Sequence, residues 1–190
     1  MALCKTMLDN YSDEELFSKA TERFRHYDVQ CPGCGSPKLS PYTDYSRGLI
    51  SYEKGNVVDR IIWAKRFVCK SCGSTHALLP DILTPYSAYS LRFKLTVLIA
   101  YYERDTTVAA VCERFCIAIS TLYAWKDRLL EHKELFLGML TSNSVPAVVF
   151  LRRMIKPTTD LSILLRSFFR RYSFSFLQNR SMSATQNRPP

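Results

Sequence analysis

Four cysteines in two matched pairs are the residues of this sequence whose types and spacing predict chemistry. Cys31 and Cys34 form the first Cys-x-x-Cys pair, Cys69 and Cys72 form the second, and a glycine directly follows each pair. A two-residue spacer lets one tight turn direct two sulfur atoms at one ion, and glycine supplies the positive φ that such a turn often needs. Four thiolates complete the tetrahedral shell of Zn²⁺ and leave no position open for a substrate. The spacing therefore predicts a structural zinc site.

Other chemistries also use such cysteines. Disulfides belong to oxidising compartments, and the chain begins without the apolar core of a signal peptide. A redox centre needs one Cys-x-x-Cys at a strand-to-helix junction, whereas two matched pairs occur here. Iron stays open as an alternative, because iron and zinc share four-sulfur ligation. His76 is a fifth candidate ligand, but four cysteines already satisfy an ion, so we interpret it as a surface residue or as support for a ligand.

Positive charge is distributed unevenly along the chain. The net charge is +9, and residues 146–190 contain eight Lys or Arg residues and a single acid, Asp160. A basic segment attracts phosphate backbones or anionic membranes, although a solvated tail is the simpler reading. A hydrophobic content of 47% argues for a folded core, and the apolar runs are much shorter than a bilayer span. We expect a cytoplasmic protein without a membrane partner.

Short strands are the elements that must position the cysteines. The segment 49–52, a turn at 54–56 and the β-branched and aromatic segment 57–68 predict a small antiparallel sheet. A sheet that carries two metal-binding turns is a zinc ribbon, which we assign to residues 31–85 and which depends on the ion to fold. Before it, residues 1–30 contain a helix that begins with a capping box at Ser12. Prolines after it predict a linker.

A helical period begins at Ser90. It predicts a helix over 90–104, a short helix ending near Phe115, a break around 116–118 and a longer third helix. A short helix, a three-residue turn and a longer helix form the helix-turn-helix pattern. The residues expected to face inward on the second and third helices are Val108, Val111, Cys112, Phe115, Leu122, Trp125 and Leu129.

Two further helices are predicted to complete a helical domain over residues 86–177. The first spans about 145–155 and exposes Arg152 and Arg153. The second follows a cap at Thr158–Asp160, with Arg170 and Arg171 outside its apolar stripe, and we expect it to dock on the helix-turn-helix. Residues 178–190 are polar, and we expect a mobile tail there. The apolar stripe of the last helix consists of Leu161, Leu164, Leu165, Phe168, Phe169 and Tyr172.

The stretch from Thr107 to Lys126 resembles the helix-turn-helix of bacterial insertion-element transposases. In that family a small residue at the position of Cys112 lets two helices cross closely, and the start of the third helix enters the major groove. Departures occur at Cys116, where glycine is usual, and at Ala118, where a serine N-cap is usual. The resemblance implies that the DNA-facing residues are Ile119, Ser120, Thr121, Tyr123, Ala124 and Lys126.

With the two cysteine motifs and the Leu79-Pro80-Asp81 linker, the chain resembles a bacterial family of short proteins that pair a zinc ribbon with a transposase-like helix-turn-helix. The resemblance covers about residues 25–180 and implies binding to double-stranded DNA. It also implies an α+β fold, a small antiparallel zinc ribbon followed by an all-α domain. The cations expected to contact phosphates are Lys126, Arg128, Arg152, Arg153, Arg170 and Arg171.

Catalysis is not expected. Common transposases cut DNA with three carboxylates that hold two metal ions, and Asp160 is the one acid in the last 45 residues. We therefore predict a non-enzymatic, nucleoid-associated DNA-binding protein related to mobile elements. Two alternatives remain, a protein-interaction module that binds a partner through the ribbon and a catalytically incomplete transposase subunit.

Overall fold

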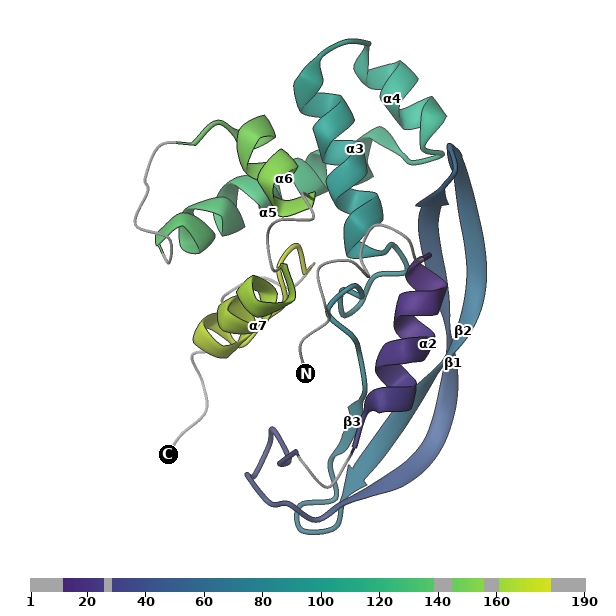
Figure 1. Ribbon diagram of the computed structural model, residues 1–190, viewed down its shortest axis with the longest axis vertical. Helices are drawn as coiled ribbons and strands as arrows, with labels where there is room; N and C mark the ends of the chain where they lie inside the picture. The colour runs from purple at the N-terminus through teal and green to yellow at the C-terminus, as the bar shows by residue number, and fades with distance from the viewer. Residues whose placement is uncertain (1–11, 26–28, 139–144, 156–160, 179–190) are drawn as a thin grey trace.

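The computed structural model describes residues 12–25, 29–138, 145–155 and 161–178, without the side chains of residues 137, 138, 161 and 162. Within them the fold is mixed, with a three-stranded antiparallel sheet and six helices. Figure 1 shows the long β1–β2 ribbon along one side of the molecule, with α2 against it and the other helices alongside. The expected cap of residues 158–160 and the tail beyond residue 178 lie outside the described residues.

The sheet has the order β1-β2-β3, with β1 at Leu39–Glu53, β2 at Asn56–Cys69 and β3 at Thr75–Ala77. A two-residue turn joins β1 to β2, and its Lys54 and Gly55 have φ of 50° and 87°. Two positive φ values match the twist of a tight hairpin. β1 begins ten residues earlier than its expected strand, because a strand at the edge of a sheet accommodates Pro41.

Helix α2, Asp13–Arg23, covers one face of the ribbon. Ser12 and Glu15 form the predicted capping box, in which each side chain bonds the other's backbone N–H. Leu16 and Phe17 belong to one buried cluster with ribbon and linker residues. This cluster, here called the ribbon cluster, consists of Leu16, Phe17, Leu49, Ile62, Ala64, Ile82 and Leu83.

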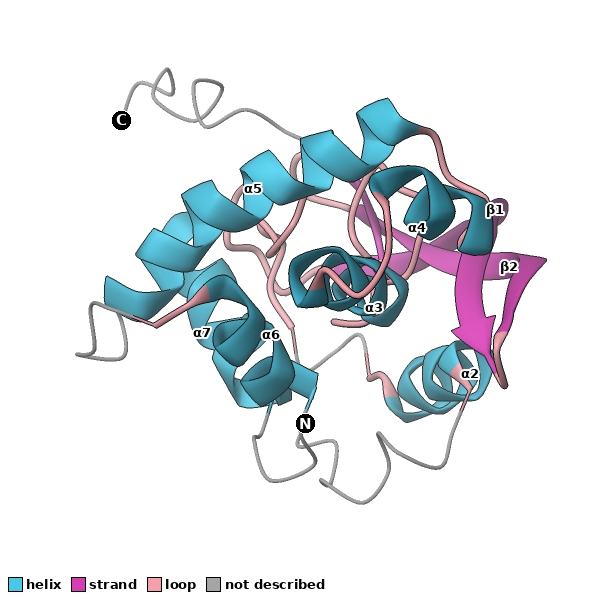
Figure 2. Cartoon of the chain, turned by 90° about the horizontal axis from the view of Figure 1, so that it is seen from above, coloured by secondary structure: helices cyan, strands magenta, loops and turns pink. Residues whose placement is uncertain are grey.

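Helices α3, Leu91–Glu103, and α4, Val108–Arg114, each follow an N-cap residue. The side chains of Ser90 and Thr107 accept the backbone N–H of Phe93 and Ala110. Seen from above, α3 lies between α4, α5 and α6 (Figure 2). Helix α5 spans Ile119–Gly138, α6 spans Ala147–Ile155 and α7 spans Leu161–Tyr172.

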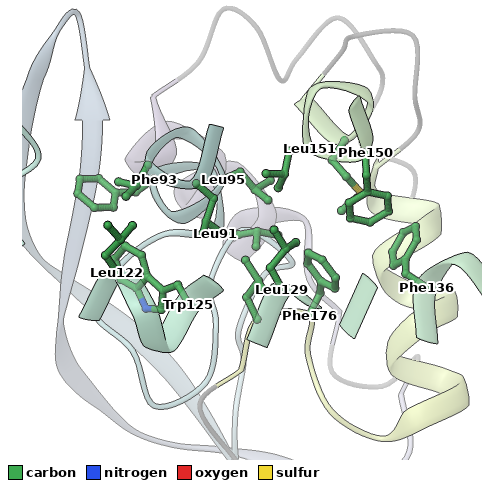
Figure 3. Packing of buried hydrophobic residues seen from close by; sticks show 14 of the residues in the cluster. Leu91, Phe93, Leu95, Leu122, Trp125, Leu129, Phe136, Phe150, Leu151 and Phe176 are labelled. Atoms are coloured by element: carbon green, nitrogen blue, oxygen red, sulfur yellow. The ribbon is translucent and has the colours of Figure 1, made fainter. Parts of the chain in front are cut away.

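The second buried cluster, here called the helical cluster, is larger and rich in aromatic residues. Figure 3 shows Trp125 on α5 near Phe93 on α3. Trp125 lies edge-on to Phe93 and to Tyr89, with ring centroids 6.1 and 4.9 Å apart. Phe176, which follows α7, packs its ring against Phe136 at 5.5 Å. Phe169, expected in the apolar stripe of α7, is instead 51% exposed, because it lies at the border of the stripe.

The segment between the two clusters is packed against the sheet. The N–H of Ile50 donates to the carbonyl of Ala88, and the N–H of Ser90 donates to the carbonyl of Ile50. Leu83 and Thr84 are buried. Near the same end of β1, Tyr52 packs against Phe115 with ring centroids 4.8 Å apart. The hairpin end of the β1–β2 ribbon therefore packs against the helical cluster.

Candidate functional site

Each cysteine pair is held by the same local geometry. In the first turn the N–H of Gly35 donates to the carbonyl of Cys31 at 2.8 Å, and in the second the N–H of Gly73 donates to the carbonyl of Cys69 at 2.9 Å. Both glycines have φ of 72°, the left-handed conformation predicted from the sequence. In both turns the residue after glycine is a serine whose carbonyl accepts the N–H of the first cysteine.

The two turns bring four sulfur atoms together. All four Sγ atoms lie within 4.8 Å of one another. Cys31 Sγ is 3.7 Å from Cys72 Sγ, and Cys34 Sγ is 3.6 Å from Cys69 Sγ. A tetrahedral shell with zinc–sulfur bonds of about 2.3 Å has sulfur–sulfur edges of about 3.8 Å. The four cysteines could therefore hold one metal ion, as the spacing predicted.

Local hydrogen bonds, desolvation and the neighbouring thiols shift the pKa values of the cysteines in opposite directions. The N–H of Ser36 favours the Cys34 thiolate, but desolvation and the neighbouring thiols raise the pKa of Cys34 to about 12. Hydrogen bonds from Ser74 lower the pKa of Cys72 to about 6. Four adjacent thiolates repel one another, and a divalent cation at their centre removes that repulsion. The donor set thus suits a cation better than four free thiols.

His76 on β3 supports the cluster without joining it. Its Nε2 lies 3.2 Å from Cys31 Sγ, close enough for a hydrogen bond to sulfur. The hydroxyls of Ser36 and Ser71 meet at 2.8 Å and join the two turns. Cys31 and Cys69 are buried, whereas Cys34 and Cys72 are exposed. The ion would therefore sit at the end of the ribbon, close to solvent.

A second candidate site is the surface formed by α4, its following turn and α5. The two helices are bent by 102° relative to each other. Cys116 has φ of 50°, so this non-glycine residue adopts the left-handed conformation at the position where the resemblance expects glycine. Phe115, Ile117 and Leu122 are buried beneath the turn. Ala118 supplies only its carbonyl as a cap, accepting the N–H of Thr121 and Leu122.

The residues predicted to face DNA lie at the start of α5. Ile119 is 50% exposed and Tyr123 is 39% exposed, whereas Trp125, one residue after Ala124, is buried. Ser120 and Ala124 are also exposed, and Thr121 and Lys126 are half-buried. The Lys126 ammonium lies 3.0 Å from the Asp127 carboxylate and 5.2 Å from the centre of the Tyr123 ring.

The predicted phosphate-binding cations fall into two groups, one on α5 and α6 and the other on α7. Arg128 pairs with Glu131 on α5, and Arg152 pairs with Glu103 at the end of α3. Arg153 is exposed on α6. Arg170 and Arg171 lie on α7, which packs against the far end of α5, where Tyr172 Oη donates to the carbonyl of Leu135 at 3.0 Å. Fifteen residues of helix, about 22 Å, separate Ser120 from Leu135.

Sequence reasoning missed two arginines beside α4. Arg104, at the C-cap of α3, has φ of 58° and is exposed. Arg114, at the end of α4, is exposed, lies over the rings of Tyr52 and Phe115, and donates to Tyr52 Oη at 3.2 Å. The sequence signal available for both arginines was their position at the end of a helix, where basic residues complement the helix dipole.

The ribbon also carries exposed apolar groups. Ile61 is 73% exposed and Trp63 is 65% exposed, on successive outward positions of β2. Their cross-strand partners are Gly48 and Ser46. These two positions have the opposite orientation to Ile62 and Ala64, which face α2. Large apolar groups with such exposure often mark contact surfaces.

Residues 31–125, which are half of the chain, match a family described as a domain of unknown function, DUF6431. The chain belongs to this family. The DUF6431 match begins at Cys31 and ends at Trp125 in α5, so it includes both cysteine pairs, the sheet, α3, α4 and the start of α5. No curated protein and no solved structure gives a significant match.

Among the described residues, no single helix has the length and apolar character needed to cross a membrane. The bent pair formed by α4 and the part of α5 up to Phe136 reaches both criteria only when the two helices are taken together.

Proposed function

We propose that this protein is a zinc-containing, non-enzymatic DNA-binding protein, related to the DNA-binding part of insertion-element transposases. In this proposal α4 and α5 form a helix-turn-helix whose second helix enters the major groove. The cysteine cluster holds a structural zinc ion that shapes a ribbon beside it. The fold class is then α+β, a zinc ribbon followed by a helix-turn-helix domain, and the expected location is the nucleoid of a bacterial cytoplasm.

The single observation that carries the proposal is the geometry of α4, its turn and α5. The 102° bend lies within the range of about 90–120° for helix-turn-helix units. The turn places Leu122 and Trp125 in the core, which leaves Ile119, Ser120 and Tyr123 free to face a groove. An α-helix fits the major groove, and the N-terminal residues of the second helix contact base edges.

Cations beside this surface support the same proposal. Arg104 and Arg114 flank α4, and Lys126 and Arg152 add positive charge near α5 and the end of α3. Arg170 and Arg171 lie at the far end of α5, so in this proposal they contact phosphates outside the segment that α5 reads. The net charge of +9 favours association with a polyanion.

The absence of catalysis is part of the proposal and rests on how the acids are used. Glu53 pairs with Arg60, and Asp13 lies near Arg92. Asp81 is near Arg166. These carboxylates come from distant parts of the fold and are engaged by cations, whereas two-metal catalysis needs converging free carboxylates. A transposase subunit that lacks its catalytic carboxylates would share this surface.

We propose zinc because four-cysteine structural sites are typical of it, and iron, which shares four-sulfur ligation, is the alternative metal. Elemental analysis of the purified protein, together with its visible spectrum, distinguishes the two metals. One zinc per chain and no visible absorption are expected. An absorbing iron centre would overturn the zinc assignment but not the DNA proposal.

Binding to duplex DNA at several salt concentrations is the decisive measurement. If all six cations of this proposal contact phosphates, the logarithm of the association constant falls against the logarithm of salt with a slope of about −5.4. Fluorescence anisotropy with a labelled random 30-base-pair duplex would measure it. Failure to bind at micromolar protein in low salt would exclude the proposal.

A pair of charge variants tests the assignment to α5. Ser120→Glu places a carboxylate on the exposed first turn, where the helix dipole favours it, so the fold should remain intact. We expect it to weaken duplex binding at least tenfold. Ser18→Glu adds the same charge at an exposed position of α2 and serves as the matched control. Equal effects of both variants would move the DNA surface away from α5.

The exposed Ile61 and Trp63 favour a second candidate, a ribbon that binds a protein partner. In that case a stoichiometric complex from native extract should survive nuclease treatment and should be lost in Trp63→Ser. A complex that disappears with nuclease would favour the DNA proposal instead.

A further inference from the structure

The exposed side chains at the start of α5 are mainly apolar, which bears on the sequence that the proposed helix-turn-helix would read. Ile119 and Tyr123 lie four residues apart, on one side of the helix, and are 50% and 39% exposed. Ala124, the next residue, is exposed and has a side chain of one carbon, which permits close approach. The opposite side carries Leu122 and Trp125, which are buried in the helical cluster.

Hydrogen-bonding groups that distinguish guanine or adenine are scarce at this surface. Residues 118–127 contain no arginine, asparagine or glutamine. Their one cation, Lys126, is bound to the Asp127 carboxylate at 3.0 Å and lies over the Tyr123 ring. Bidentate contacts to guanine come from Arg or Lys, and those to adenine come from Asn or Gln. The first two turns of α5 therefore offer apolar surface and the hydroxyls of Ser120, Thr121 and Tyr123.

Thymine is the base whose major-groove edge matches apolar surface, because its 5-methyl group projects there. Cations beside the surface, Arg104 and Arg114, would hold a polyanion against it by charge complementarity. We propose that α5 reads thymine 5-methyl groups in the major groove, through Ile119 and the ring of Tyr123. This inference rests on the proposed DNA-binding function and specifies the bases that the same surface recognises.

The test compares thymine with deoxyuridine, which lacks only the 5-methyl group. Duplexes that bind the full-length protein would first be selected from a random library. Each thymidine of a selected duplex would then be replaced singly by deoxyuridine, and the dissociation constants compared. We expect about a fourfold weakening at each contacted position, the effect of losing one buried methyl group. Substitution at positions outside the contact should change nothing.

Two isoleucine variants assign the effect to α5. Ile119→Ala should bind thymidine and deoxyuridine duplexes equally at the position that Ile119 contacts. Ile119 is half-exposed in a helix, where alanine is well tolerated, so this variant should fold. Ile61→Ala changes an isoleucine of β2 that is 73% exposed and should keep the wild-type difference.

The outcomes are distinct. Tight duplex binding with equal affinity for thymidine and deoxyuridine at every position would overturn the thymine inference and leave the DNA proposal standing. A difference that persists in Ile119→Ala and in Tyr123→Ala would overturn the assignment to these side chains. No duplex binding at low salt would overturn the proposed function and this inference together, and would favour a protein partner on the same face.

Discussion

The ribbon cluster and the helical cluster bury side chains in different ways. Among the described residues, the ribbon cluster contains seven buried side chains, of which one is aromatic, and it lies beside a sheet that ends in four thiols. The helical cluster contains 22 buried side chains from the same described part of the chain and is built around the rings of Phe93, Trp125 and Phe136. A small apolar cluster supplies little folding free energy, so we expect the ribbon to depend on an ion, whereas the helices stabilise themselves by packing.

The ribbon and the helical cluster are in contact, so the difference in how they are stabilised does not hold for the whole ribbon. Ile50, Tyr52 and Val57, at the hairpin end of the ribbon, pack against the helical cluster. The cysteines lie at the other end of the same strands, because Cys69 pairs with Leu39 while Tyr52 pairs with Val57. The same two strands therefore carry the four-cysteine cluster at one end and pack against the helical cluster at the other.

Removal of the metal should have the largest effect. Cys69→Ser, or a strong chelator, should expose the amides of Cys31, Gly35 and Gly73 to hydrogen exchange, because structural zinc contributes on the order of 10 kcal/mol in isolated fingers. The amides of Ile50 and Ser90 should stay protected, because they bond within packed structure. Hydrogen exchange with mass spectrometry measures both sets.

Cys116→Ser is the control, since Cys116 is exposed and outside the cluster. Loss of protection at Ser90 in the Cys69→Ser variant would mean that ribbon and helices unfold as one cooperative unit.

The two tryptophans offer a matched comparison of the regions. Trp125 is 2% exposed and Trp63 is 65% exposed. Trp125→Ala should cost about 3–5 kcal/mol of unfolding free energy, because it leaves a cavity in the helical cluster. Trp63→Ala should change it by less than about 0.5 kcal/mol. Urea denaturation followed by circular dichroism measures both, and a large cost for Trp63 would show that its face is covered in solution.

Lys94 should make stability depend on pH. Its ammonium is buried in α3 and bonds to Thr84 Oγ1 at 3.2 Å and to the carbonyl of Leu177 at 3.3 Å. Desolvation, and then the charge of Arg47, lower the pKa of Lys94 from 10.5 to about 7. Between pH 7 and pH 10.5, Lys94 is protonated in the unfolded chain and largely neutral in the folded chain. Because the unfolded chain then holds more protons, the free energy of unfolding rises with pH across that window.

The rise should be on the order of 3 kcal/mol between pH 7 and pH 10. Urea denaturation at several pH values should show it for the wild type and show a flatter profile for Lys94→Met. Lys65→Met, at an exposed position of β2, should keep the wild-type profile. An unchanged profile in Lys94→Met would assign the pH dependence to other groups.

The smallest effect is expected at the turn between α4 and α5. Cys116→Gly should stabilise the protein by about 1 kcal/mol, because glycine adopts φ of 50° without the steric cost of a side chain. Cys112→Gly should destabilise it, since Cys112 is buried inside α4. Thermal unfolding of the two variants gives opposite shifts, and destabilisation by Cys116→Gly would indicate that the thiol itself contributes to the turn.

Local signals predicted most elements and the metal cluster. The capping box at Ser12 begins its helix as expected, and the helix predicted from Ser90 begins with that residue as its cap, because a side-chain oxygen satisfies an N–H within three residues. The two Cys-x-x-Cys turns converge as their spacing predicted. The start of β1 was missed, because its pairing with Phe67 and Val68 depends on residues more than 25 positions away.

Long-range packing accounts for what the sequence concealed at the candidate sites. Nothing local to Ile61 or Trp63 indicates which face of β2 receives α2, so their exposure could not be predicted. The same holds for Arg114, whose position over Tyr52 depends on how the hairpin meets α4.

The sequence by itself determined the four-cysteine cluster, the helix boundaries and the short α4 followed by α5, because each follows from spacing within a turn or from a helical period. The tertiary structure alone decided that the linker residues Leu83 and Thr84 are buried, that Lys94 is enclosed beneath Leu177, and that the hairpin end packs on the helices. These features arise from contacts between distant segments, whose free energies depend on burial that no local pattern specifies.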